Sequence, residues 1–111
     1  PSVLSAMQSL LGKWSCDVRA ARDVAAVEAL IAEAAFIPEI VLADFHLDHG
    51  ELGSDAIGRL RAVYSSRLPA IVITADHAPE LAAELMRQGC EVLRKPVRPA
   101  ELRALMLHLL G

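Results

Sequence analysis

The sequence predicts an α/β domain in which a parallel sheet lies between two layers of helices. Short apolar runs at 40–43, 70–73 and 92–93 alternate along the chain with segments of helical periodicity. The first two runs are hydrophobic without interruption, which is typical of parallel strands covered on both faces. Strands that alternate with helices favour parallel pairing, and in such sheets the chemistry takes place beyond the carboxyl ends of the strands.

Length and composition limit the classes of function. The chain has 111 residues, 54% hydrophobic and 23% charged, which suits one domain with a single core. Its formal net charge of −3 predicts no direct binding to nucleic acid or to a membrane surface. No apolar stretch approaches the roughly 20 residues that span a bilayer, and no signal-peptide pattern opens the chain, so we expect a cytoplasmic module. Cys16 and Cys90 are expected to be buried free thiols.

The expected elements follow in the order α-β-α-β-α-β-α-β-α. The first helix starts almost at the N-terminus, with apolar residues at helical spacing from Val3 to Leu11. Alternation over 16–20 predicts a half-exposed edge strand, and Asp23 can cap the next helix. A strand over 40–43 and a loop over 45–53 come next, followed by a helix with Ala56, Ile57, Leu60 and Tyr64 and a strand over 70–73. The next helix starts at Pro79, carries Leu81, Leu85 and Met86, and ends at Gly89. A strand over 92–93 and a helix from Pro99, with Leu102, Leu105, Met106 and Leu109 inward, complete the chain.

Three of these strands end, in chain order, in Asp44, Thr74 and Lys95. A parallel sheet would bring this carboxylate, hydroxyl and ammonium to one rim. An ionised carboxylate can attack phosphorus and form an acyl phosphate, while Lys95 and Thr74 bind the phosphoryl oxygens. Charge on those oxygens calls for a divalent cation, and Mg²⁺ suits an all-oxygen site. The pattern therefore predicts a phosphoryl-transfer site.

Each residue also has an ordinary structural interpretation. Asp44 alone would serve as a turn or helix-cap residue, Thr74 as a β-branched strand residue, and Lys95 as a solvated loop residue. Agreement of all three at one rim favours the site.

Four motifs carry a resemblance to the response-regulator receiver family along essentially the whole chain. They are Ile-Val-Leu-Ala-Asp over 40–44, Leu-Asp-His-Gly-Glu-Leu-Gly over 47–53, Ile-Thr-Ala-Asp over 73–76 and Leu-Arg-Lys-Pro-Val over 93–97. The spacings of 30 residues from Asp44 to Thr74 and 51 from Asp44 to Lys95 are also those of the family. The resemblance implies a flavodoxin-like (CheY-like) doubly wound parallel sheet with strand order 2-1-3-4-5.

The resemblance also implies a role for each site residue. Asp44 would be phosphorylated, Thr74 would be the switch hydroxyl, and Lys95 would bind the phosphoryl group and precede a cis bond to Pro96. Mg²⁺ would bind the Asp44 carboxylate and the backbone carbonyl of His46.

Three further positions are interpreted through the same resemblance. The side chains of His46 and Asp76 would tune hydrolysis; otherwise His46 is a plain loop residue and Asp76 caps the helix after Pro79. Val92 stands where many receivers carry Tyr or Phe, so the aromatic half of the usual switch is absent.

Receivers begin with a strand that ends in two acidic Mg²⁺ ligands, and this chain begins after that point. We therefore expect residues 1–111 to form a single receiver domain that lacks the first strand, with the acidic pair upstream of Pro1. The upstream segment would be disordered, trimmed or supplied by another chain.

The function implied is a phosphoacceptor of two-component signal transduction. It would accept a phosphoryl group from a histidine kinase or phosphotransfer domain and catalyse its own uptake and dephosphorylation. The sequence of residues 47–53 and 95–103 most resembles that of receivers of bacterial hybrid sensor histidine kinases. One alternative is a non-phosphorylated receiver-like interaction domain. A second is an aspartyl-phosphate hydrolase, which would want an acid where His46 stands. Homodimerisation stays open.

Overall fold

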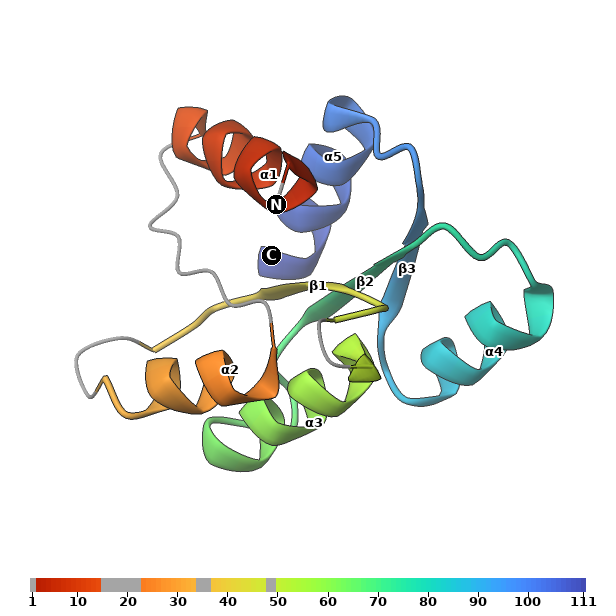
Figure 1. Ribbon diagram of the computed structural model, residues 1–111. Helices are drawn as coiled ribbons and strands as arrows, with labels where there is room; N and C mark the ends of the chain where they lie inside the picture. Colours follow the sequence, from red (N-terminus) through yellow and green to blue (C-terminus); the bar gives the residue numbers. More distant parts are fainter. Residues whose placement is uncertain (1, 15–22, 34–36, 48–49) are drawn as a thin grey trace.

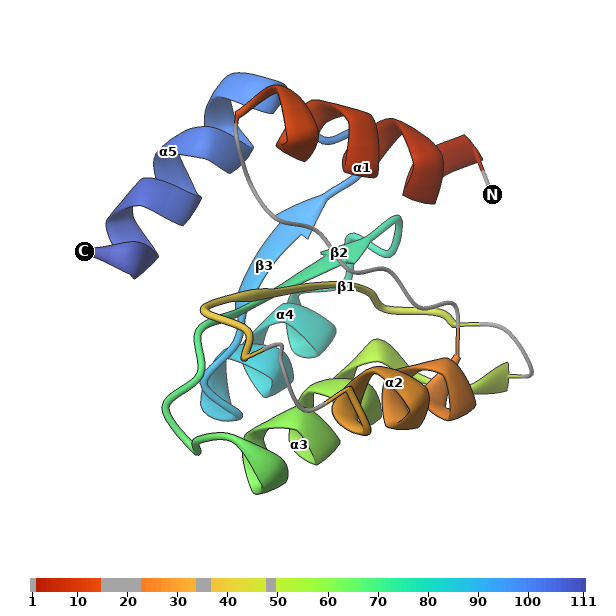
Figure 2. The same ribbon diagram turned by 90° about the vertical axis from the view of Figure 1, so that its left-hand side faces the viewer.

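The computed structural model describes residues 2–14, 23–33, 37–47 and 50–111, with side chains in the first helix from residue 8. The described elements, in chain order, are α1 (Ser2–Lys13), α2 (Val24–Ile31), β1 (Val41–Asp44), α3 (Gly53–Val63), β2 (Ala70–Thr74), α4 (Pro79–Arg87), β3 (Glu91–Arg94) and α5 (Pro99–Leu110). Helices α1 and α5 cover one face of the sheet, and α2, α3 and α4 cover the other (Figures 1 and 2). The edge strand expected at 16–20 lies outside the described residues.

The described strands form one parallel sheet in the order β1-β2-β3. In this register Asp44 lies opposite Ile73, and Thr74 lies opposite Arg94. The prediction of three neighbouring parallel strands is confirmed. All three strands also end at the same rim, as the site prediction requires.

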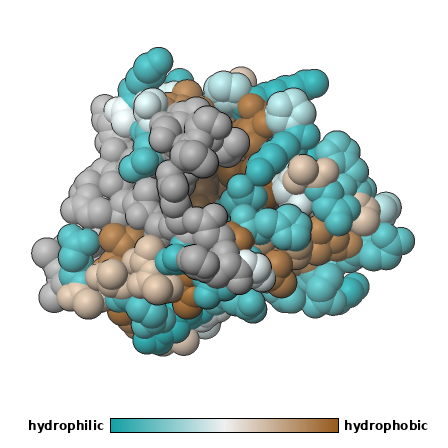
Figure 3. Space-filling model, in the orientation of Figure 1, coloured by the Kyte–Doolittle hydropathy of each residue, from teal (hydrophilic) through white to brown (hydrophobic). Residues whose placement is uncertain are grey.

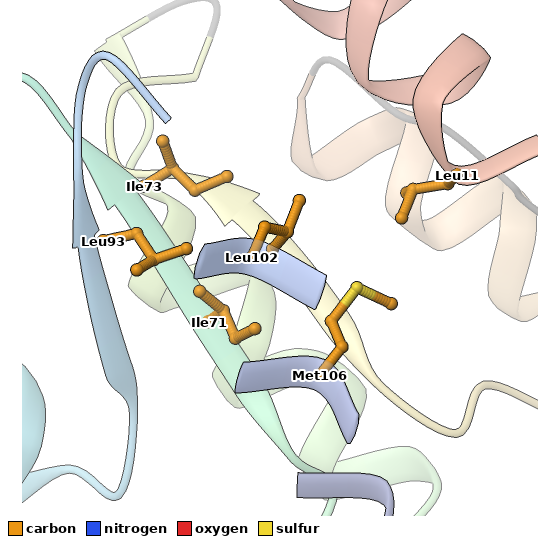
Figure 4. Packing of buried hydrophobic residues seen from close by; sticks show 6 residues of the cluster. All are labelled: Leu11, Ile71, Ile73, Leu93, Leu102 and Met106. Carbon is orange, nitrogen blue, oxygen red and sulfur yellow. The ribbon is translucent and has the colours of Figure 1, made fainter. Parts of the chain in front are cut away.

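Strand β2 is the centre of the core, because all five of its residues are buried. On one face its side chains meet α1 and α5 in a cluster of residues that point toward one another (Figure 4): Leu11, Ile71, Ile73, Leu93, Leu102 and Met106. The other face holds a second cluster: Ala43, Ile57, Ala70, Val72, Leu85 and Cys90. On the outside, hydrophilic residues surround smaller hydrophobic patches on the face shown in Figure 3.

Several helix ends follow the predicted signals. The Asp23 carboxylate accepts a hydrogen bond from the Ala26 N–H at 2.7 Å and so caps α2. Pro79 and Pro99 stand in the first turns of α4 and α5, where a missing N–H is tolerated. Gly89 follows α4 with a φ of +79°, a left-handed conformation that glycine adopts without steric cost.

Two predicted boundaries differ from the structure by one residue, although β1 ends in Asp44 as expected. Strand β1 begins at Val41 and includes Asp44, so the acid is the last strand residue. The loop expected over 45–53 is shorter, because α3 already begins at Gly53. The Gly53 N–H donates to the Phe45 carbonyl at 2.8 Å, which folds the chain back and lets the helix start there.

Helix α4 buries a narrower stripe than its apolar residues suggested. Leu85 is 1% exposed, whereas Met86 is 61% exposed, because neighbouring residues of a helix point about 100° apart. Cys90 is a buried free thiol as predicted, and Cys16 lies outside the described residues. No helix in the described part of the chain is long and apolar enough to cross a membrane.

Replacing Leu85 by alanine should lower the free energy of unfolding by about 2–5 kcal/mol, since it leaves a cavity against β2. Met86→Ala, one residue along the same helix, should change it by less than about 0.5 kcal/mol, because this side chain is exposed. Urea denaturation of both variants measures the difference. Equal losses would show that α4 packs through a different face.

Candidate functional site

An ion pair joins the ends of β1 and β3. The Lys95 Nζ lies 3.0 Å from the Asp44 Oδ2, and the two side chains are 30% and 37% exposed. Because β2 lies between β1 and β3, this pair spans the end of the central strand, and a lysine is long enough to do so. The predicted carboxylate and ammonium therefore meet at the rim, with part of each surface open to solvent.

Thr74 is the last residue of β2, the strand whose end this ion pair spans. Its side chain is 1% exposed, and its carbonyl accepts a hydrogen bond from the Lys95 N–H at 2.8 Å. Its Oγ1 accepts from the Asp76 N–H at 3.0 Å. A hydroxyl that accepts one hydrogen bond keeps its own O–H for donation. The described geometry brings Asp44, Thr74 and Lys95 together at one rim.

The backbone of Asp44 is held closely from two sides. The next N–H, that of Phe45, donates to the Ile73 carbonyl at 2.8 Å and continues the ladder to β2. On the other side, a Cβ on Gly53 would lie 2.1 Å from the Asp44 carbonyl oxygen and 3.2 Å from the Ala43 Cβ. Only glycine lets α3 begin this close to the phosphoacceptor candidate.

The loop that follows Asp44 is tied to α2 through Glu51. Its carbonyl accepts from the Leu47 N–H at 2.8 Å, and its Oε1 accepts from the Val24 N–H at 2.9 Å. A carboxylate at the first turn of a helix is favoured by the helix dipole and by the unpaired N–H groups there. In the sequence Glu51 resembles an ordinary loop residue, because its contact joins segments 27 residues apart.

The remaining predicted residues lie around this centre. His46 is exposed, and its ring meets the edge of Phe45 at a centroid distance of 4.9 Å. The prediction that Asp76 caps α4 was wrong, because Ala78 is the N-cap residue and α4 has no side-chain cap bond. The Asp76 Oδ1 instead accepts a hydrogen bond from the Ala78 N–H, before the helix begins. Val92 is half-buried in β3 opposite Val72, and it packs against the second cluster.

The Lys95–Pro96 bond is cis, as the resemblance implied. The cis bond therefore joins Pro96 directly to Lys95, the residue that pairs with Asp44.

The sequence profile of the response regulator receiver domain matches residues 1–107. The chain belongs to the receiver domain family. Receiver domains act in two-component signal transduction, where their partners are histidine kinases, and they typically bind Mg²⁺. No curated protein matches the chain in sequence.

Solved structures share the receiver fold. The BeF3-activated N-terminal receiver domain of RstA from Klebsiella pneumoniae is 28% identical, with a TM-score of 0.79 over 98% of this chain and 91% of that chain. A CheY-like receiver domain protein from Methanospirillum hungatei is 18% identical, with a TM-score of 0.82 over 98% and 85%. The receiver domain of NtrX from Brucella abortus is 22% identical, with a TM-score of 0.78 over 92% and 84%.

The described part of the rim offers few oxygen ligands for a metal ion. Within the described ranges, no three His, Cys, Asp or Glu side chains gather closely enough to hold a metal ion. The Asp44 carboxylate and the His46 carbonyl are oxygen donors of the kind that Mg²⁺ prefers. The chemistry of these two groups is compatible with Mg²⁺, and they would supply only part of its ligands.

Gly53→Ala should lower the free energy of unfolding by about 1–3 kcal/mol or more, because its Cβ collides with the Asp44 backbone. Gly58→Ala, in the same helix and with open space around its added Cβ, should raise it by about 0.5–1 kcal/mol. Urea denaturation compares the two. A neutral Gly53→Ala would contradict the close approach of α3 to Asp44.

Proposed function

We propose that Asp44 accepts a phosphoryl group and that this receiver domain switches conformation in response. The observation that carries the proposal is the 3.0 Å ion pair of Asp44 with Lys95 at the carboxyl rim, where β2 ends in the buried Thr74. Family membership supports it, since receivers act in two-component signalling. The carboxylate is partly exposed, so a phosphodonor can reach it.

The reaction is a displacement at phosphorus. An Asp44 oxygen forms a bond to the phosphorus of a phosphohistidine, and the P–N bond breaks with its electron pair going to the imidazole. Lys95 first balances the charge of the Asp44 carboxylate and then binds a phosphoryl oxygen. The Thr74 O–H donates to a second oxygen. These two groups stabilise charge where it develops, which is the main catalytic contribution open to such a site.

Mg²⁺, when bound, neutralises charge on the phosphoryl oxygens. In this chain the Asp44 carboxylate and the His46 carbonyl would hold it. The remaining ligands are proposed to be the acidic pair expected upstream of Pro1. His46 and Asp76 are proposed to tune hydrolysis, since each lies two residues beyond a site residue at the exposed rim.

The wider context is also a proposal. Residues 1–111 are proposed to form one receiver domain, in which β1, β2 and β3 are the last three strands of a five-stranded sheet of order 2-1-3-4-5. The sequence of residues 47–53 and 95–103 supports an origin in a bacterial hybrid sensor histidine kinase, with a cytoplasmic location. The donor would then be a histidine kinase or a phosphotransfer domain.

Asp44→Asn should abolish labelling of the full-length protein by acetyl phosphate or phosphoramidate with Mg²⁺, because an amide is not a nucleophile for phosphorus at neutral pH. Asp55→Asn, an exposed acid in the first turn of α3, should be labelled like the wild type. Intact mass and acid-lability of the label measure the outcome. Labelling of Asp44→Asn would contradict the assignment of Asp44 as the phosphoacceptor. Failure to label the wild type would favour a receiver-like interaction domain.

Thr74→Ala should be labelled at a rate within roughly tenfold of the wild type but should lose the conformational response, because the hydroxyl that would move toward the phosphoryl group is gone. Thr74→Ser keeps the hydroxyl and should keep the response. Hydrogen exchange of residues 75–82, with and without beryllofluoride and Mg²⁺, measures it. The same response in Thr74→Ala and wild type would show that this hydroxyl is no switch.

A further inference from the structure

Arg61, in the last turn of α3, binds three backbone carbonyl groups outside its own helix. Its Nε donates to the Leu68 carbonyl at 3.0 Å, just before β2. Its Nη1 and Nη2 donate to the carbonyls of Gln88 and Gly89 at 2.9 and 2.8 Å, just beyond α4. The last carbonyls of a helix have no intrahelical partner, and a cation is favoured there. Arg61 supplies hydrogen-bond donors to the two residues that follow α4 and a positive charge at that end of the helix.

The C-terminal end of α4 is also held by packing and by backbone hydrogen bonds. Leu85 and Cys90 are 1% and 3% exposed, and the Cys90 N–H donates to the Leu85 carbonyl at 3.0 Å. The guanidinium lies against Gly89, where an added Cβ would be 3.6 Å from Nη1. This end of the helix is therefore attached to α3, to the segment before β2 and to the second cluster.

The N-terminal end of α4 has weaker attachments. Its N-cap, Ala78, makes no side-chain cap bond, and the bond from the Ala82 N–H to the Ala78 carbonyl is 3.4 Å long. A hydrogen bond from the Asp76 N–H to the Thr74 Oγ1 links this end to the sheet, and Leu81 packs against the second cluster while staying only partly buried. The neighbouring residues at this end are exposed: Ala75, Asp76, His77, Pro79 and Glu80.

Helix α3 joins this arrangement to the site. Its first residue, Gly53, lies against the Asp44 carbonyl, and Arg61 lies in its last turn. The helix has 11 residues and therefore a length of about 16 Å. One rigid element thus connects the backbone of Asp44 to the C-terminal end of α4.

We infer that Arg61 is a positioning residue that fixes the C-terminal end of α4 relative to Asp44 and confines the response to phosphorylation to residues 75–82. The inference rests on the proposed function of Asp44. When Thr74 follows the phosphoryl group, the 75–78 segment and the first turn of α4 move, while residues 86–92 keep their positions. A partner that reads the phosphorylated state would then detect the N-terminal half of α4.

Amide hydrogen exchange of the full-length protein, with and without beryllofluoride and Mg²⁺, tests this inference. In the wild type, exchange should change in 75–82 and stay the same in 86–92. In Arg61→Met, the change should extend into 86–92, and amides there should exchange roughly tenfold faster even without beryllofluoride, because the hydrogen bonds to a charged group are lost.

Two further variants sharpen the test. Arg59→Met removes a cation from the same helix that pairs with Glu28 of α2 and not with α4, so its pattern should match the wild type. Arg61→Lys keeps the charge, but an ammonium lacks the planar fork that reaches several carbonyls, so its pattern should be intermediate. Arg61→Lys carries the test if Arg61→Met does not fold.

The inference is overturned if wild-type exchange changes as much in 86–92 as in 75–82, or if the Arg61 variants keep the wild-type pattern while beryllofluoride still binds. A wild type that does not bind beryllofluoride, and behaves as Asp44→Asn does, contradicts the proposed function and the inference with it. Beryllofluoride binding is measured separately by intact mass under native conditions, so the two failures are distinguishable.

Discussion

Parallel pairing on both sides of β2 is the constraint on which the other features depend. All five residues of β2 are buried, and both hydrophobic clusters include its side chains. Because β1 and β3 flank it in parallel, their carboxyl ends come to the rim where β2 ends. The Asp44–Lys95 pair therefore spans the end of β2, where Thr74 is buried. The hydrophobic core and the site are consequences of one strand arrangement.

The sequence predicted those parts of the fold and site that depend on local pattern. Apolar runs identified the three strands, and the polar residues that follow them at the rim are Asp44, Thr74 and, one residue beyond β3, Lys95. Local pattern could not give the start of α3 at Gly53, since that depends on how closely a helix can approach the Asp44 backbone. It also could not separate Leu85 from Met86, because both are apolar and only packing against β2 decides which is buried.

Long-range polar contacts were beyond sequence reasoning for a different reason. Arg61 looks like an ordinary basic residue in the last turn of a helix, and Glu51 like a solvated loop acid. Their partners are backbone groups, which carry no sequence signal. One clue was present: Gly89 marks the end of a helix, and helix ends leave carbonyls that need donors. Arg61, which donates to the two carbonyls just past that helix end, is 28 positions from Gly89 and can be recognised only when α3 and α4 are placed.

The energies of the contacts at the rim are suited to a switch. The Asp44–Lys95 pair is about one-third exposed, so it contributes at most about 1 kcal/mol to stability and opposes rearrangement only weakly. Two hydrogen bonds to side chains hold the 75–78 segment, from the Asp76 N–H to Thr74 and from the Ala78 N–H to Asp76, each with a net value of about 0.5–1.5 kcal/mol. A phosphoryl group on Asp44 would add roughly −1.5 to −2 charges beside Lys95 and the Thr74 hydroxyl. The contacts at the rim are thus individually weak, and the Arg61 hydrogen bonds lie at the other end of α4.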